Sequence, residues 1–467
     1  MANATTDSSG AFSTSFTVPK SAAPGDHTVT AAGQSSGLSA TRNFLVRTDW
    51  PKFHFGAGNG GFNKYENLIG PSNVSGLAPA WTAATGIETY SAPAIVKGIV
   101  YIGSPTSMGS PDANLYAFSA SGTTGCSGTP KTCQPLWTAP TTYIGNSSPA
   151  VANGVVYIGA TGFYAFSASG TKGCSGTPKV CQPLWTADNG YAIDSSPVVA
   201  NGVVYVGSID DNLEAFSASG STGCSGTPKV CQPLWIGPTG NQIGSSPAVA
   251  NGVVYIGSND HNLYAFSTSS AGCSGTPKTC QPLWIGPTGS FVGSSPTVAN
   301  GVVYVGSVDS KLYAFSASGT TGCSGTPKVC QPLWTGATGG GIVSSPALAN
   351  GVVYVGSDDG KLYAFSASGT TGCSGTPKIC QPLWTGATGN AVQSSPAVAN
   401  GVVYVASYDG SLYAFSASGT TGCLGIPKTC QPLWISSAHF DLSSPAVANG
   451  VVYAGSDDGQ LHAFGLP

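Results

Sequence analysis

The chain has 467 residues, of which only 7% are charged, and its formal net charge is -3 at pH 7. So weak an overall charge gives no argument for a nucleic-acid or membrane partner. No apolar run is long enough to cross a bilayer, and the opening residues, MANATTDSSG, lack the basic and apolar regions of a signal peptide. We therefore expect neither nucleic-acid binding nor membrane insertion.

Residues 1–47 contain three short alternating stretches, FSTSFTVP, HTVTAAG and ATRNFLV, separated by turn residues. This pattern is typical of β-strands. The segment resembles the C-terminal half of a bacterial immunoglobulin-like module, which implies a partial immunoglobulin-like β segment. Residues 48–76 are rich in Gly and Asn with interspersed aromatic residues, which predicts an irregular linker packed on the domain that follows.

Residues 77–467 are built from a unit that repeats about every 50 residues. Each unit predicts four short strands; in the unit that begins at Ser245 they are SSPAVA, VVYIGS, NLYAFS and PLWIG. Asn251 and Gly252 between the first two form a preferred hairpin turn. Four-stranded units with this period are typical of a β-propeller, in which neighbouring blades cover both faces of each sheet.

The stretch GVVYVGSDDGKLYAF, residues 351–365, followed by a Trp before the next SSP motif, resembles the repeat of the pyrroloquinoline-quinone-like (PQQ-like) β-propeller family. That family includes quinoprotein alcohol dehydrogenases and an outer-membrane-protein assembly lipoprotein. In its motif A-x-D-x-x-T-G-x-x-x-W the Trp packs between blades; here Ser replaces the Asp and an octet precedes the Trp. The resemblance implies this blade-docking role for Trp81, Trp137, Trp185, Trp235, Trp284, Trp334, Trp384 and Trp434.

Eight repeats predict an all-β, eight-bladed β-propeller of four-stranded antiparallel blades. The first of the blade-type Trp residues precedes the first SAP or SSP motif, and the chain ends at LHAFGLP, one strand short of a full unit. We therefore expect an N-terminal strand, residues 77–83, to supply the outer strand of the last blade and so to close the ring. The expected domains are residues 1–47, 48–76 and 77–467, and the propeller is expected to be monomeric.

All 14 Cys residues fall in seven octets of the type CSGTPKVC, two in each octet at positions i and i+7. An even and local set of this kind indicates disulfides formed in an oxidising compartment. Zinc is the alternative, but it requires four converging ligands, and no His lies near any pair. The predicted bridges are Cys126–Cys133, Cys174–Cys181, Cys224–Cys231, Cys273–Cys280, Cys323–Cys330, Cys373–Cys380 and Cys423–Cys430. Each octet is expected between the third and fourth strands of a blade.

The strand order places the loops between strands 2 and 3, and those between blades, on one side of the ring, the top face. From residue 77 onward these loops hold Glu88 and all the Asp residues, whereas the opposite bottom face holds Lys residues and no acid. Turn formation by Asp and solubility conferred by Lys explain this separation in structural terms. The alternative is an acidic mouth that attracts Ca²⁺ or a basic partner.

Positions that vary between repeats, just before the SSP motif, are expected to line the rim of the central channel on the top face. The candidates for ligand contact are Tyr90, Asn146, Asp194, Gln393, His439 and Asp441. Variation in such loops is otherwise neutral.

The family resemblance also bears on a quinone cofactor. Its cofactor-binding members hold the quinone with an Arg, a stacked Trp, an adjacent Cys-Cys disulfide and calcium ligands. Here the only Arg residues are Arg42 and Arg47, outside the propeller, and no adjacent Cys pair, C-x-x-C-H haem site or G-x-S-x-G elbow occurs. We therefore expect a non-catalytic, secreted or cell-surface binding or scaffold module without a cofactor, whose top face takes a protein or glycan partner. The alternatives are a PQQ- and Ca-dependent quinoprotein dehydrogenase and a propeller that binds cell-wall polysaccharide.

Overall fold

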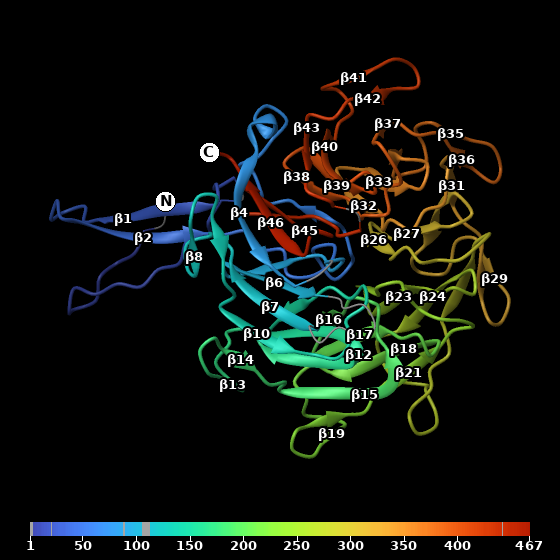
Figure 1. Cartoon of the computed structure of the whole chain (residues 1–467), viewed down its shortest axis with the longest axis horizontal. Coiled ribbons are helices and arrows are strands. Elements are labelled where there is room, and N and C mark those ends of the chain that lie inside the picture. Colours follow the sequence, from blue (N-terminus) through green and yellow to red (C-terminus); the bar gives the residue numbers. More distant parts are fainter. Residues whose placement is uncertain (1–2, 20, 87–88, 105–112, 441) are drawn as a thin grey trace.

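The structure is a computed structural model that describes residues 3–19, 21–86, 89–104, 113–440 and 442–467. Within these ranges the regular elements are β-strands, apart from the short 3-10 helix η1 (Val74–Gly76). Figure 1 shows the sheets arranged in a ring, with one two-stranded hairpin that projects away from it. None of the described elements is a helix long and apolar enough to span a membrane.

The projecting hairpin consists of β1 (Gly25–Ala32) and β2 (Ser39–Val46), which pair antiparallel with Gly25 opposite Val46. Residues 12–19, the first of the three strands expected in this region, form no strand. An isolated two-stranded sheet gains little stability in water, because one face cannot be covered from within it. The immunoglobulin-like assignment of this segment stays a prediction.

Seven blades are each folded from one continuous segment of the chain. Blades 1 to 4 contain, from the centre outward, β5 (Ala94–Val96), β6 (Ile99–Ser104), β7 (Asn114–Ser119) and β10 (Trp137–Pro140); β11 (Ala150–Ala152), β12 (Val155–Ser167) and β15 (Trp185–Ala192); β16 (Val198–Ala200), β17 (Val203–Gly207), β18 (Asn212–Ser217) and β21 (Trp235–Pro238); β22 (Ala248–Ala250), β23 (Val253–Gly257), β24 (Asn262–Ser267) and β25 (Trp284–Pro287).

Blades 5 to 7 have the same order. They contain β26 (Thr297–Ala299), β27 (Val302–Ser307), β28 (Lys311–Ser316) and β31 (Trp334–Ala337); β32 (Ala347–Ala349), β33 (Val352–Ser357), β34 (Lys361–Ser366) and β37 (Trp384–Ala387); β38 (Ala397–Ala399), β39 (Val402–Ser407), β40 (Ser411–Ser416) and β43 (Trp434–Ser437). The turn between the first two strands has positive φ at both central residues, as at Asn251 (49°) and Gly252 (78°), which is the geometry that the Asn-Gly pair favours.

The expectation of eight equal, four-stranded antiparallel blades is wrong. Seven blades come from continuous segments, and the ring is closed by a composite sheet, the closing sheet, in which β44 (Ala446–Ala448), β45 (Val451–Gly455) and β46 (Gln460–Gly465) pair with β4 (Ala78–Ala84) from before the first repeat. Most sheets also exceed four strands and are not purely antiparallel. The physical reason is that the octets reach sideways and extend the neighbouring sheet.

Each octet is a small hairpin closed by its disulfide, so the seven predicted bridges are confirmed. Six octets form strand pairs: β8 (Cys126–Ser127) with β9 (Thr132–Cys133), β13 (Cys174–Ser175) with β14 (Val180–Cys181), β19 (Cys224–Ser225) with β20 (Val230–Cys231), β29 (Cys323–Ser324) with β30 (Val329–Cys330), β35 (Cys373–Ser374) with β36 (Ile379–Cys380), and β41 (Cys423–Leu424) with β42 (Thr429–Cys430). The second strand of each pair runs parallel to the outer strand of the preceding sheet.

The interfaces between sheets repeat one contact. Trp137 of blade 1 is 2% exposed, and a Cβ added to Gly170 of blade 2 would lie 2.2 Å from its ring, so only glycine fits there. The hydroxyl of Tyr101 donates to the carbonyl of Ala168 across the same interface at 2.8 Å. Burial of the indole and the hydrogen bond of the phenol hydroxyl therefore both depend on the next blade. We expect neighbouring blades to fold cooperatively for this reason.

Residues 50–63 run inside the ring, and we call this segment the channel thread. Backbone carbonyls of the thread accept hydrogen bonds from the inner strands of blades 2, 4, 5, 6 and 7: Pro51 from Val151, Ala57 from Val249, Gly58 from Val298, Gly60 from Leu348 and Gly61 from Val398, at 2.7 to 2.8 Å. The thread also pairs with blade 1 through Trp50 and Ile95, and its strand β3 (Phe62–Asn63) runs parallel to β38. The channel is thus filled by the chain itself at the end nearest the bottom face.

Candidate functional site

The top face is braced by aspartates that accept hydrogen bonds within and between loops. Asp260 accepts from the amide of Asn262 at 3.0 Å, from the amide of Gly240 at 2.8 Å and from the hydroxyl of Tyr264 at 2.5 Å. The same Tyr-to-Asp hydrogen bond recurs at Tyr313 and Asp309, Tyr363 and Asp359, and Tyr413 and Asp409. Burial, together with this hydrogen bond, raises the pKa of Tyr363 to about 12.

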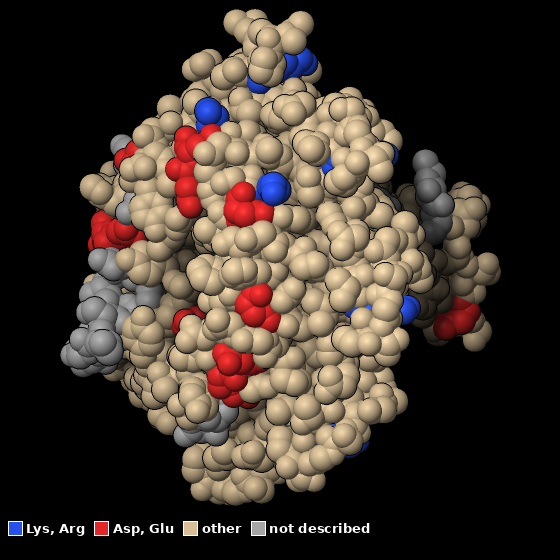
Figure 2. Space-filling model, turned by 90° about the vertical axis from the view of Figure 1, so that its right-hand side faces the viewer, with Lys and Arg blue, Asp and Glu red and all other residues tan. Residues whose placement is uncertain are grey.

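These contacts favour a structural role for the repeated aspartates, since an Asx turn and a loop brace use the carboxylate oxygens. In Figure 2 most of the visible acidic side chains lie in the left half of the view, and most of the visible Lys and Arg atoms lie elsewhere. Lys361 is an exception, with its Nζ 3.2 Å from Asp359. Within the described residues, no group of three or more His, Cys, Asp or Glu is placed to hold a metal ion. A cation or basic partner at this face stays a prediction.

A belt of buried serines encircles the channel near the top face. The second Ser of each SSP motif accepts a hydrogen bond from its counterpart one blade earlier, as where the amide of Ser246 donates to Oγ of Ser295 and the amide of Ser295 donates to Oγ of Ser345, at 2.8 and 2.9 Å. The series includes Ser148, Ser196, Ser395 and Ser444 and also ties Ala92 to Ser148. These hydroxyls join neighbouring blades around the channel. The repeated SSP motif therefore has a structural role and does not indicate a ligand site.

One predicted residue lies at the centre of a polar cluster on the rim. The side chain of Gln393 donates from Nε2 to Asp358 Oδ1 at 2.9 Å, and its Oε1 accepts from the hydroxyl of Tyr408 at 3.2 Å. These three side chains come from blades 6 and 7, and Tyr408 is 36% exposed. Amide, carboxylate and phenol together offer a ligand both donors and acceptors.

The other predicted residues lie apart from this cluster. Asp194 is half-buried against the loop that carries Asn146, because a Cβ at Gly145 would lie 2.1 Å from its carboxylate. Burial raises the pKa of Asp194. Asn146 is exposed and Tyr90 is half-buried.

His439 is exposed on its loop, has a positive φ of 59°, and accepts from the amide of Asp457 through its backbone carbonyl at 2.9 Å. Its side chain therefore stands beside a fixed turn. Asp441 lies outside the described residues.

Aromatic side chains on the rim are the feature that sequence reasoning missed. Tyr143, Tyr191 and Phe291 are 42%, 51% and 49% exposed; Tyr143 and Phe291 lie in loops between blades, and Tyr191 lies near the end of β15, in segments where the repeat breaks down. The available signal was an aromatic residue in a variable loop of a protein whose other aromatic residues recur in strands. An exposed aromatic ring beside polar groups is a common feature of binding surfaces.

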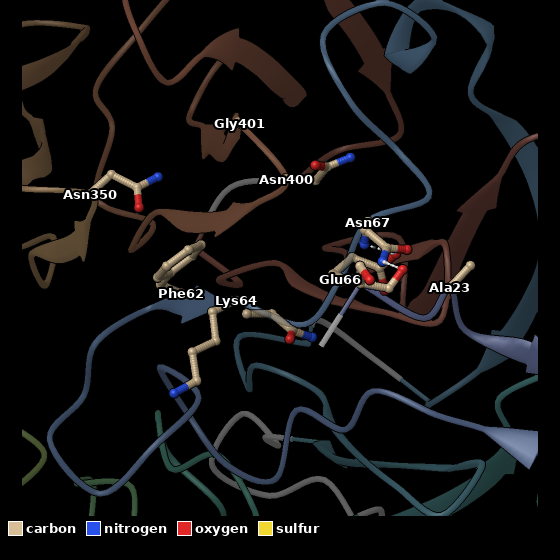
Figure 3. A pocket seen from close by; sticks show the side chains of 10 residues that line it. Ala23, Phe62, Lys64, Glu66, Asn67, Asn350, Asn400 and Gly401 are labelled. Atoms are coloured by element: carbon tan, nitrogen blue, oxygen red, sulfur yellow. Dashed lines mark hydrogen bonds between the residues drawn. The ribbon is translucent and has the colours of Figure 1, made fainter. Parts of the chain in front are cut away.

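The bottom face carries a cavity of about 640 Å³ between the channel thread, the N-terminal segment and two Asn-Gly turns. Figure 3 shows Phe62, Asn350, Asn400 and Glu66 around it, with Lys64 directed away from the others. Glu66 is already engaged as an acceptor from Thr48 Oγ1 and the Gly450 amide. The lining offers amide groups but no described nucleophile with a neighbouring base.

The lysines of the octets also have structural partners. Lys229 Nζ donates to the carbonyl of Gly220 at 3.0 Å, and Lys428 Nζ donates to that of Gly419 at 3.2 Å. Lys179, Lys328 and Lys378 make the same contact. These five lysines therefore tie their octets to their own blades.

Comparison with known proteins bears on the family. A family model described as outer membrane protein assembly factor BamB matches residues 231–323 and 331–466. The chain belongs to the PQQ-like β-propeller family. No curated protein sequence matches it.

Solved structures of this PQQ-like propeller fold share little sequence with the chain. BamB from Moraxella catarrhalis is 14% identical with a TM-score of 0.58, covering 83% of this chain and 97% of its own. Quinohemoprotein alcohol dehydrogenase from Comamonas testosteroni is 12% identical with a TM-score of 0.61, covering 89% and 80%. The computationally designed Ika8 protein is 14% identical with a TM-score of 0.60, covering 83% and 99%. At such identities the likeness shows the fold alone.

The residues of this PQQ-like propeller do not fit the quinone site of the family's dehydrogenases. Arg42 lies on the projecting β2, and Arg47 donates to the carbonyl of Lys97 at 3.2 Å on the bottom face. All Cys residues are bridged at a separation of seven positions, which leaves no adjacent pair. The donor set for a quinone is therefore not assembled.

Proposed function

We propose that the chain is a non-catalytic binding module of a secreted or cell-surface protein, which takes a glycan on the rim of its top face. The observation that carries this proposal is the exposure of Tyr143, Tyr191, Phe291 and Tyr408 at positions that the repeat does not dictate. Apolar rings in water cost free energy that a partner relieves by covering them.

The polar cluster that includes one of these rings, Tyr408, supports a glycan over a purely apolar ligand. Sugar rings present apolar faces that stack on aromatic side chains and hydroxyl groups that need donors and acceptors. Gln393, Asp358 and Tyr408 supply such groups within one hydrogen-bonded set. The repeated aspartates and serines are engaged in building the fold, which leaves the variable rim residues to make contacts.

The seven disulfides indicate an oxidising compartment. Together with the low charge of the chain they support a location outside the cell. A secreted module in that setting meets polysaccharides of cell surfaces and walls.

The test is an array of glycans and cell-wall polymers, followed by titration calorimetry of any hit. We expect Gln393→Ala and Tyr408→Ala each to weaken binding about tenfold or more, since each removes a hydrogen-bonding group at the site. Tyr65→Ala is the matched control, because Tyr65 is a 42% exposed tyrosine on the opposite face. An array without hits, or equal loss in the control, contradicts the proposal.

A further inference from the structure

The outer edge of every sheet but one is covered in the same way. The octet of each blade leans on the outer strand of the preceding sheet, as where β42 runs parallel to β37 with Cys430 opposite Gly386. The carbonyl of the octet lysine accepts from an outward backbone amide on that strand, as Lys428 does from Thr385 at 3.0 Å. This amide belongs to Thr82, Thr138, Thr186, Ile236, Ile285, Thr335 and Thr385 around the ring.

The exception is β43, the outer strand of blade 7. By this rule its cover would be an octet of the closing sheet, but within residues 1–467 no octet joins β46 to β4. Among the described residues no strand pairs with the outer side of β43, which is the last strand of its sheet.

Exposure of side chains marks the same gap. Ile435, at the position of Thr385, is 51% exposed. Ile285, at the equivalent position of a covered edge, is partly buried. Trp434 is half-buried, while its seven counterparts are 1% to 3% exposed. Its indole nitrogen donates to the carbonyl of Leu77, a substitute for the next blade.

The octet that leads into β43 differs from the other six. Its sequence is CLGIPKTC, and Leu424 and Ile426 replace the Ser and Thr found in most octets. These side chains are 82% and 101% exposed. Blade 7 thus combines an open strand edge with exposed apolar side chains on its own octet. Both features are typical of a surface that binds a partner.

We propose that the outer edge of β43 binds a disulfide-closed octet hairpin that lies outside residues 1–467. The hairpin adds in parallel, its lysine carbonyl accepts from the amide of Ile435, and its residue before the second Cys covers the Ile435 side chain. This is strand addition in the geometry that the ring uses at its other edges. A second copy of this chain is not the donor, because its seven octets are engaged in its own ring.

The site lies on the circumference of the ring, away from the top-face rim, so the inference does not depend on the proposed glycan binding. The probe is a fluorescein-labelled, oxidised peptide with the sequence of residues 320–333, titrated against the disulfide-intact protein by fluorescence anisotropy. We expect saturable binding with one peptide per chain.

Two variants locate the peptide. Ile435→Pro removes the outward amide and should weaken binding about tenfold. Ile435→Thr is the matched control, because Thr occupies this position in blades 1, 2, 5 and 6, and it should bind like the unaltered protein. The reduced and alkylated peptide should bind more weakly, since its hairpin is no longer closed.

Hydrogen exchange gives a readout that does not rely on a variant. The amide of Ile435 should exchange rapidly in the free protein and slow when the peptide is added, whereas those of Thr335 and Thr385 should be protected throughout. No saturable binding, undiminished affinity in a folded Ile435→Pro protein, or protection elsewhere overturns the proposal. So does a dimer in sedimentation that Ile435→Pro dissociates, because a second copy would then occupy the edge.

Discussion

At the scale of single residues, the channel thread encloses a lysine that forms no ion pair with any acidic residue in the described part of the chain. Lys52 is 6% exposed, and its Nζ donates to the carbonyl of Phe53 at 2.6 Å and to the side-chain oxygen of Asn59. Burial lowers the pKa of Lys52 to about 7 from an ordinary value of 10.5. Burial likewise lowers the pKa of His54, to about 3.

The depressed pKa of Lys52 makes stability depend on pH. Between about pH 7 and 10.5 the unfolded chain holds a proton that the native state has lost, so the free energy of unfolding rises with pH there. The slope is at most about 1.4 kcal/mol per pH unit, and below pH 7 the full destabilisation is present. Urea unfolding from pH 6 to 10 should show this rise, and Lys52→Met should remove it.

Lys64→Met is the control for that measurement, since Lys64 is an exposed lysine in the adjoining segment. Parallel pH profiles for the unaltered protein and Lys52→Met would show that Lys52 keeps an ordinary pKa.

The sequence identified some residues of the candidate site but not its composition. Gln393 stands out because it breaks the repeat, and the structure places it in the cluster with Asp358 and Tyr408. Tyr408 sits in a loop between strands 2 and 3, where other repeats have different residues, so only the fold reveals that it reaches Gln393. The exposure of Tyr143 likewise depends on loop geometry that no local pattern encodes.

At the scale of elements, the octets act as staples on strand edges. Each disulfide closes a short loop and stabilises by about 2 kcal/mol through chain entropy, a contribution that does not simply add across the set. Each octet also covers an edge strand that would otherwise fray. Reduction should therefore lower the melting temperature in calorimetry without changing ligand binding on the top face. Equal melting temperatures with and without reductant would contradict this role.

The local parts of these elements could be predicted, whereas their lateral contacts could not. Asn-Gly turns and the i, i+7 Cys pairs are signals within a few residues, and both occur as expected. The parallel pairing of an octet with the preceding blade joins residues such as Thr385 and Thr429. That contact arises only when two units lie side by side, and nothing in one unit specifies it.

At the scale of the whole molecule, the repeat and its closure by β4 follow from the sequence, but equal blades do not. Aligning repeats counts units, whereas the structure distinguishes seven continuous blades from a closing sheet made of both chain ends. The sequence predicts an irregular linker for residues 48–76, because it has no local pattern of regular structure. The hydrogen-bond partners of the thread lie on strands that are far away in sequence. The need for glycine in the thread becomes clear only from the fold. A Cβ at Gly58 would lie 2.8 Å from the carbonyl oxygen of Val298.

The thread should be a determinant of global stability. Asn59 is fully buried, and its Nδ2 donates to the carbonyls of Pro247 and Pro296 at 3.1 and 3.2 Å, which joins blades 4 and 5 through the centre. Asn59→Ala removes the donor to these two carbonyls and one acceptor of Lys52, so it should lower the free energy of unfolding by about 1 to 3 kcal/mol. Chemical unfolding measures this directly. Asn67→Ala, which removes a half-buried side chain beyond the thread that donates only to the carbonyls of Ser21 and Ala22, should have a much smaller effect, and equal losses would contradict the assignment.

The thread also has a meaning for the history of the gene. Nearly identical tandem units are prone to gain or lose a copy by unequal recombination, and the sheets themselves differ too little to reject an extra one. A peptide of fixed length whose carbonyls accept from the inner strands of blades 2, 4, 5, 6 and 7 fits one circumference of the ring. A chain with an added unit would leave an inner strand without its carbonyl partner, so selection on the thread would hold the copy number constant while the units themselves remain interchangeable.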